Sequence, residues 1–178
     1  MLSPNQQLMT IPGLESLTLS KQWSNLQFIA APKLRNLVLT YRDEKQPEGV
    51  TISALRRATV RPISLSTDCV SDTCLTELLK LWSSLSELHL RGRNNICIPG
   101  EITTTALAGC GDAVPLCSSL RYLTVHMEQG WKDSKITNQS IQRLQTIVEE
   151  RKSHCLQRVM CVWDRKGHST DVEWIDVL

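Results

Sequence analysis

The sequence predicts an α/β domain in which strands lie side by side in a parallel sheet and helices or loops connect them. Three observations predict this class. A short leucine motif recurs along the chain, its copies are separated by the length that a parallel crossover needs, and several crossovers carry apolar residues at helical spacing. A chain of 178 residues is most simply one domain and can bury a core without disulfides or metal.

The motif is LxxLxL, in which two alternate apolar residues follow a third that lies three positions earlier. Three copies match it strictly, one ends in valine, and two weaker copies keep apolar residues in the same frame. In chain order the copies are Leu14–Leu19, Leu34–Leu39, Val60–Leu65, Leu85–Leu90, Leu120–Val125 and Leu156–Cys161. Their starts are separated by 20, 26, 25, 35 and 36 residues. The first three intervals lie within the range of about 20–29 residues that is typical of leucine-rich repeats.

Strand geometry gives a reason for the recurrence. The last two apolar residues of each copy are two positions apart, so they share one face of a strand. A single strand with one apolar face is not stable in water, whereas stacked parallel copies bury those faces in a continuous core. The sequence therefore predicts a leucine-rich-repeat solenoid, with a curved parallel sheet and helices or loops on its convex side. We expect six irregular repeats over residues 14–178, after an N-terminal lead of residues 1–13.

The segments between the copies predict the connecting elements. Ser71–Trp82 has apolar residues at helical spacing behind a serine that can cap a helix, and Ile136–Lys152 has the same periodicity. Thr103–Ala108 is expected to be a shorter helix, whereas Trp23–Ala31 is too short for a full one. The polar segment Asp43–Gly49 contains proline and glycine and is expected to be a surface loop.

The two ends of the predicted sheet differ. The ending Val172–Leu178 alternates apolar and polar residues, which is typical of a short closing strand. At the other end, only 13 residues precede Leu14. Because the ends of a solenoid need polar caps, we expect the first strand to be an exposed apolar edge that promotes self-association.

Alternate side chains of each strand point away from the core, so folding does not dictate their identity. In the first three copies these positions hold mostly small residues. In the last three they include arginine, tyrosine and methionine, which are enriched at protein interfaces. We predict a partner-binding surface made of Glu87, His89, Arg91, Tyr122, Thr124, His126, Arg158 and Met160.

Composition and spacing argue against other classes of function. A net charge of +2 gives no strong attraction to nucleic acid or to an anionic membrane, and no apolar run is long enough for a membrane helix. The seven cysteines lack CxxC pairs and follow no secretory signal, so we expect reduced thiols, no metal site and a cytoplasmic or nuclear location. The glycine-rich Gly109–Asp112 lacks the ending of a phosphate loop and is typical of a helix stop, so neither a catalytic residue nor a cofactor is predicted.

Several segments resemble the leucine-rich region of fungal F-box proteins. The similarity rests on Pro12–Leu19, Ala31–Leu39, Trp82–Leu88 and Pro115–Leu123, and it extends from Pro12 to the C-terminus. In that family the leucine-rich region recognises a protein substrate, and an N-terminal F-box docks on the adaptor of a ubiquitin ligase. The lead of residues 1–13 leaves no room for an F-box. The resemblance therefore implies binding to a protein of unknown identity, and to the ligase adaptor only if an F-box lies upstream in a longer form.

We therefore expect a non-enzymatic protein-interaction module that resembles the substrate-recognition part of an F-box ubiquitin-ligase receptor. Two alternatives stay open at this point. One is a compact α/β domain with small-molecule or enzymatic function, whose leucines are only core residues. The other is a generic leucine-rich scaffold of another family. A repeat architecture makes one specific demand, because it places Leu17, Leu37, Leu88 and Leu123 on adjacent strands that run in the same direction.

Overall fold

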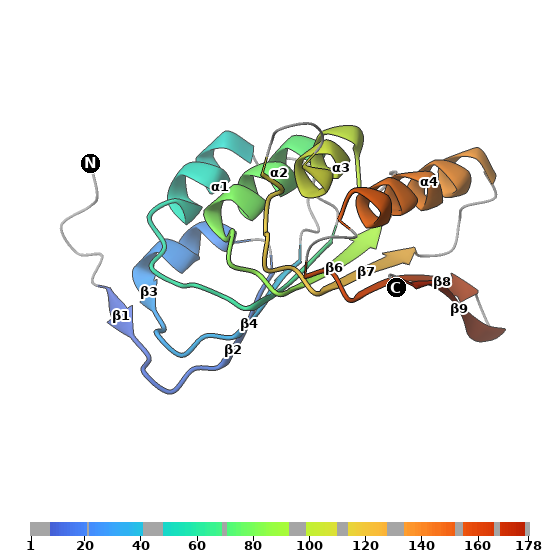
Figure 1. Cartoon of the computed structure of the whole chain (residues 1–178). Coiled ribbons are helices and arrows are strands. Elements are labelled where there is room, and N and C mark those ends of the chain that lie inside the picture. Colours follow the sequence, from blue (N-terminus) through green and yellow to red (C-terminus); the bar gives the residue numbers. More distant parts are fainter. Residues whose placement is uncertain are drawn as a thin grey trace.

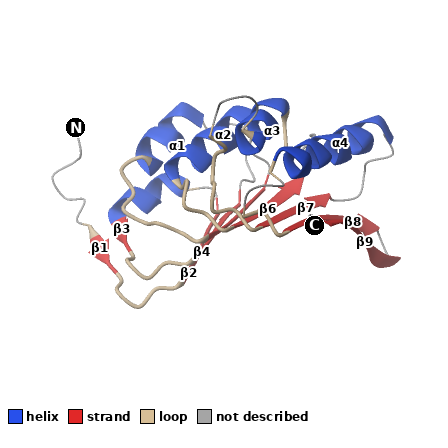
Figure 2. Ribbon diagram, in the orientation of Figure 1, coloured by secondary structure: helices blue, strands red, loops and turns tan. Residues whose placement is uncertain are grey.

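The protein has an α/β fold in which one sheet, parallel except at one edge, carries helices against one of its faces (Figure 1). The structure is a computed structural model. It describes residues 8–20, 22–40, 48–68, 71–92, 99–109, 114–127, 134–151, 155–165 and 168–176. The α-helices of the described residues lie together on the same side of the sheet, and the opposite face carries none of them (Figure 2).

Six strands of the sheet are parallel, and their order in space follows their order along the chain. They are β2 (Ser16–Ser20), β4 (Asn36–Thr40), β5 (Ser64–Asp68), β6 (Glu87–Gly92), β7 (Tyr122–Met127) and β8 (Arg158–Arg165). A seventh strand, β9 (His168–Asp176), pairs antiparallel with β8 and closes that end of the sheet, as the alternating C-terminal pattern predicts. Two short strands, β1 (Met9–Thr10) and β3 (Ile29–Ala30), form a separate parallel pair.

The register of the six parallel strands aligns one apolar residue of each copy of the motif. These residues pair in sequence across the sheet and are Leu17, Leu37, Leu65, Leu88, Leu123 and Val159. The hydrogen bonds that lead into the strands repeat in the same way. The Glu15 carbonyl accepts from the N–H groups of Arg35 and Asn36 at 2.9 and 3.0 Å, and the Arg121 carbonyl accepts from Gln157 and Arg158 at 2.8 and 3.0 Å. The predicted arrangement of the leucines on adjacent, co-directional strands is confirmed.

The third copy of the motif has a different frame from the predicted one. The register places Leu65 opposite Leu37 and Leu88, so the copy starts at Pro62 and not at Val60. Accordingly, Ile63 is 44% exposed whereas Leu65 is fully buried. The sequence misleads here because Ile63 and Leu65 are both apolar and two apart, like the end of the motif, whereas the last core position of the observed frame holds the polar residue Thr67. With the correct frame, the residues of β5 on the helix-free face are Ser64, Ser66 and Asp68.

The three predicted connecting helices are present as α2 (Asp72–Leu81), α3 (Glu101–Ala108) and α4 (Ser134–Glu150). The segment Trp23–Ala31, expected to be too short for a full helix, contains the 3-10 helix η1 (Trp23–Phe28). The Ser71 hydroxyl accepts a hydrogen bond from the Cys74 N–H at 3.2 Å, so the predicted cap of α2 is confirmed. Helix α3 ends at Gly109, whose φ of 70° lies in the left-handed region that glycine adopts without strain.

A further helix, α1 (Glu48–Leu55), corrects the prediction of a loop over Asp43–Gly49. Glu48 and Gly49 are helical, and residues 43–47 lie outside the described part of the chain. Glycine and β-branched residues lower the intrinsic helix propensity of this segment. The helix instead gains stability by packing against η1, with Ile52 and Leu55 buried.

The core lies between the sheet and the helices. Its side chains are mainly the leucines of the strand motifs and the apolar faces of the helices, together with the fully buried indoles of Trp23 and Trp82. Helices that follow one another along the chain are also neighbours in space, since α2 contacts both α1 and α3, and α3 contacts α4. Each segment of helix and strand therefore completes the burial of the segment before it.

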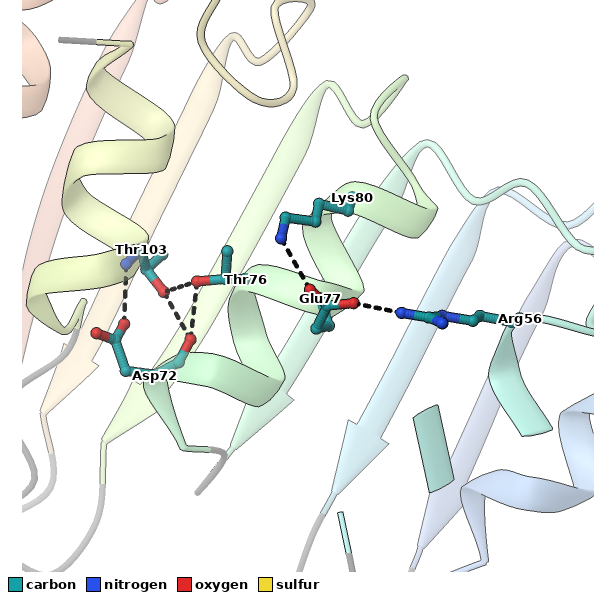
Figure 3. A network of polar contacts seen from close by, with 6 residues as sticks. All are labelled: Arg56, Asp72, Thr76, Glu77, Lys80 and Thr103. Carbon is teal, nitrogen blue, oxygen red and sulfur yellow. Dashed lines mark hydrogen bonds and ion pairs between the residues drawn. The ribbon is translucent and has the colours of Figure 1, made fainter. Parts of the chain in front are cut away.

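A carboxylate from one helix caps the next helix, as Figure 3 shows. The two carboxylate oxygens of Asp72, the first residue of α2, accept hydrogen bonds from the N–H groups of Ile102 and Thr103 at 2.7 and 3.0 Å. The Thr103 and Thr76 hydroxyls both donate to the Asp72 carbonyl, at 3.1 and 2.8 Å. The residue before α3 is Gly100, which has no side chain to cap the helix, and a Cβ at this position would overlap the Asp72 carboxylate. Asp72 thus replaces the missing local cap.

We expect the Asp72→Ala substitution to lower the free energy of unfolding by about 1–2 kcal/mol, because two helix N–H groups lose their acceptor. Gly100→Ala should also destabilise the protein, since the new methyl group displaces the carboxylate. In the Asp72→Ala background the same glycine substitution should be nearly neutral. Urea denaturation of the four proteins in this double-mutant cycle measures the coupling. An equal cost of Gly100→Ala in both backgrounds would contradict the proposed cap.

A second polar contact in Figure 3 joins α1 and α2 at the surface. The Glu77 carboxylate pairs with Lys80 at 2.8 Å and with Arg56 at 2.7 Å. Hydrogen bonds from these two cations, with that from Lys80 the stronger, lower the pKa of Glu77 below its ordinary value. Because the pair is exposed to solvent, it contributes little to stability.

One cation is completely buried within the helical layer. The Arg151 guanidinium donates to the main-chain carbonyls of Leu107, Leu116 and Cys117 at 3.4, 3.3 and 2.8 Å. Among the described residues no acidic side chain pairs with it. Arg151 follows α4, Leu107 belongs to α3, and Leu116 and Cys117 lie in the turn before β7. The Arg151 side chain therefore connects the end of α4 to α3 and to the turn before β7.

Candidate functional site

The helix-free face of the sheet is hollowed near the carboxyl ends of its central strands. The hollow has a volume of about 410 Å³. It is lined by Val38, Leu39, Thr40, Ser66, Thr67, Asp68, His89, Leu90, Arg91, Thr124, His126 and Val162. Five adjacent strands, β4 to β8, contribute to it. We call this set of residues the hollow.

Polar groups of the hollow occupy two neighbouring rungs of the sheet. On the rung nearer the carboxyl ends, Asp68, Arg91 and His126 are successive partners on β5, β6 and β7. On the rung before it, His89 of β6 pairs in register with Thr124 of β7. Residues two apart on a strand point to the same face, so the two rungs form one polar surface. The burial of the intervening leucines, such as Leu90, fixes which face this is.

A hydrogen bond across the strands orients Arg91 and His126. The Nε–H of Arg91 donates to Nδ1 of His126 at 3.4 Å. The imidazole of His126 therefore faces Arg91 with its Nδ1 as the acceptor.

The structure brings the eight predicted partner-binding residues together on one face of three adjacent strands. Three rungs hold them: Glu87, Tyr122 and Arg158 pair in register, then His89, Thr124 and Met160, then Arg91 and His126. Only His89, Arg91, Thr124 and His126 line the hollow. The other four lie beside it or toward the amino ends of the strands, where the Glu87 carboxylate is 3.8 Å from Nε2 of His89.

Sequence reasoning missed several residues of the hollow. Asp68 is the most important of them, because it is a carboxylate with only 3% of its surface exposed on the rung of Arg91. The displaced frame of the third copy hid it. The sequence gives no reason to single out Thr40 and Ser66, but their small size leaves the space that the larger neighbours surround.

None of the cysteines that the structure describes lines the hollow. Cys74, Cys117 and Cys161 are buried, as expected for small apolar side chains in the core. Burial raises the pKa of the Cys117 thiol to about 12, so this thiol stays protonated and unreactive at neutral pH. In the described residues, no group of histidine, cysteine and acidic side chains is arranged to hold a metal ion.

The hollow combines one guanidinium, two imidazoles, one carboxylate and several hydroxyls. Such a set can donate and accept hydrogen bonds to a bound surface and can complement charges of either sign.

Comparisons with known proteins identify no relative. No family model matches the chain, and neither the curated proteins nor the solved structures contain a significant match. Of the helices in the described residues, each is too short or too polar to cross a lipid bilayer.

Proposed function

We propose that this protein is a leucine-rich-repeat interaction module that binds another protein on the helix-free face of its sheet. Its role resembles that of the substrate-recognition part of an F-box ubiquitin-ligase receptor in the cytoplasm or nucleus. The proposal covers substrate binding alone. Contact with the ligase adaptor is proposed only for a longer form in which an F-box lies upstream.

The observation that carries the proposal is the difference between the two faces of the sheet. One face is committed to the core, since leucines such as Leu37, Leu88 and Leu123 are almost completely buried. The other face bears no described helix, so no helix packs against its side chains (Figure 2). In the C-terminal half these side chains include Arg91, Tyr122 and Arg158, types that dominate interface energetics.

The mixed charges on this face support a protein partner. Glu87 and Arg158 occupy the same rung on either side of Tyr122, and the exposed Arg91 lies two rungs beyond. An aromatic residue surrounded by charges of both signs is a common arrangement at a non-obligate interface, in which charges fix the register of the partner.

Alanine substitution of Glu87, Arg91, Tyr122 and Arg158 together should abolish partner binding. All four side chains are at least partly exposed, so the free energy of unfolding should change by no more than about 1–2 kcal/mol. The measurement is affinity capture with quantitative mass spectrometry, followed by calorimetric titration of each purified partner with both proteins.

The chain offers a matched control at the other end of the sheet. Alanine substitution of Glu15, Lys33, Arg35 and Asn36 also removes one acidic, two basic and one neutral residue, all exposed. Partners that are lost with the first variant should be retained with the control. If the first variant binds the same proteins as the wild type with unchanged affinity, the recognition surface lies elsewhere.

A further inference from the structure

The first strand of the sheet has an open edge. Strand β2 pairs with β4 on one side, and among the described residues no strand pairs with its other side. Its apolar side chains are consequently incompletely covered. Leu17 and Leu19 are half-buried, whereas their partners on β4, Leu37 and Leu39, are 1% and 0% exposed.

The hydrogen bonds of β2 show which backbone groups face this open edge. The Glu15 carbonyl accepts from the Arg35 and Asn36 N–H groups, so it points toward β4. Backbone groups alternate in direction along a strand, so Leu17 and Leu19 also direct their N–H and C=O groups to β4. The N–H and C=O groups of Ser16 and Thr18 and the N–H of Ser20 therefore point out of the sheet, in position to pair with another strand, whereas the Ser20 carbonyl already accepts from the Gln22 N–H at 2.9 Å.

The sequence of β2 is a palindrome. It is SLTLS, so it reads the same in both directions with Thr18 at its centre. Two antiparallel copies related by a two-fold axis at Thr18 would place Ser16 opposite Ser20 and Leu17 opposite Leu19 of the other copy. Hydroxyl side chains then face hydroxyl side chains, as Ser20 and Thr40 already do across β2 and β4 at 2.9 Å. The half-covered leucines of the two copies would meet on the core side.

The strand also lacks the features that usually protect an edge. Its five residues include no charge and no proline, and its register with β4 is continuous without a bulge. We propose that the β2 edge pairs with the β2 edge of a second copy of this chain, so that two sheets join into one across a two-fold axis at Thr18. The outward groups of Ser16, Thr18 and Ser20 form the hydrogen bonds. Edge pairing leaves the hollow of each copy accessible.

The Thr18→Pro substitution tests this arrangement directly. The Thr18 N–H faces the open edge, so proline there removes no hydrogen bond to β4 but blocks the centre of the proposed pairing twice, once in each copy. We expect wild-type protein to dimerise with rising concentration in sedimentation equilibrium. Thr18→Pro should weaken the dimer by at least about tenfold. Thr18→Ser, which keeps the N–H, should dimerise like the wild type, and circular dichroism and urea denaturation verify that all three are folded.

Disulfide cross-linking provides a second test that does not depend on the proline variant. Opposed residues of an antiparallel hydrogen-bonded pair have Cα atoms about 5.5 Å apart, a distance that a disulfide spans. The Thr18→Cys variant should therefore form a disulfide between the introduced thiols of its two copies, located by peptide mass spectrometry. The Ser16→Cys variant should not link to itself, but it should link to the Ser20→Cys variant when the two proteins are mixed. A wild-type monomer at all concentrations, association that survives Thr18→Pro, or a disulfide between two copies of the Ser16→Cys variant would each overturn the proposal.

Discussion

Replacement of Arg151 with methionine is expected to lower the free energy of unfolding by about 3 kcal/mol. Methionine replaces the unbranched aliphatic stem of the arginine, but it does not reach the position of the guanidinium and cannot donate hydrogen bonds. The carbonyls of Leu107, Leu116 and Cys117 lose the guanidinium as a partner, and each buried polar group left without one costs about 1–3 kcal/mol. Removal of a buried charge offsets part of this cost, because the guanidinium itself is desolvated in the native state.

The measurement is chemical denaturation monitored by tryptophan fluorescence and circular dichroism. Arg121→Met is the matched control, since Arg121 is exposed just before β7 and should change stability by less than about 0.5 kcal/mol. Arg151→Lys should be intermediate, because a compact ammonium lacks the fork of donors that reaches three separate carbonyls. If Arg151→Met has the same free energy of unfolding as the wild type, the hydrogen bonds of Arg151 to the three carbonyls do not stabilise the fold.

The Leu65→Ala substitution is expected to cost about 3 kcal/mol, because it leaves a cavity in the middle of a fully buried row of leucines. Ile63→Ala removes an equally large apolar side chain two residues away. It should cost less than about 1 kcal/mol, since 44% of the Ile63 surface is already exposed. Urea denaturation of the two variants side by side decides which residue of the third copy faces the core.

Similar costs for the two substitutions would restore the frame that begins at Val60, in which both side chains face the core. In that frame Ile63 is the core residue on the rung of Leu37 and Leu88, and Leu65 follows it. The comparison therefore tests the register of β5 independently of any measurement of binding.

Local sequence signals predicted much of the fold. Helix α2 was recognised from Leu75, Leu78, Leu79 and Trp82 at helical spacing behind the Ser71 cap, and those signals act within a few residues of one another. The strict copies of the motif predicted their strands equally well, because alternation identifies the buried face wherever the flanking residues are polar. The closing strand β9 followed from the same alternation.

Other elements depend on contacts between distant segments. Helix α1 has a weak local preference and forms against η1, which lies about twenty residues earlier in the chain. The cap of α3 comes from Asp72, some thirty residues before it, so the N-terminal residues of α3 alone give no indication of it. The register of β5 is likewise set by its neighbours β4 and β6.

The candidate site divides in the same way. The common face of the eight predicted residues followed from the sequence, because alternation identifies which strand positions face away from the core. The hollow could not be predicted from the sequence. It requires small residues on β4 and β5 next to large ones on β6 and β7, and which residues are neighbours across strands depends on the register. The contact between Arg91 and His126 joins residues 35 positions apart and depends on it as well.

By itself, the sequence determined that parallel strands share one apolar face and that the opposite face is richest in interface-type residues near the C-terminus. It could do so because side-chain direction alternates strictly along a strand, and a local pattern records that alternation. Only the tertiary structure decided the frame of the third strand, the interhelical cap and the position of Asp68 beside Arg91. These depend on how neighbouring strands align, and that alignment is fixed by the packing of the whole core, which no single segment encodes.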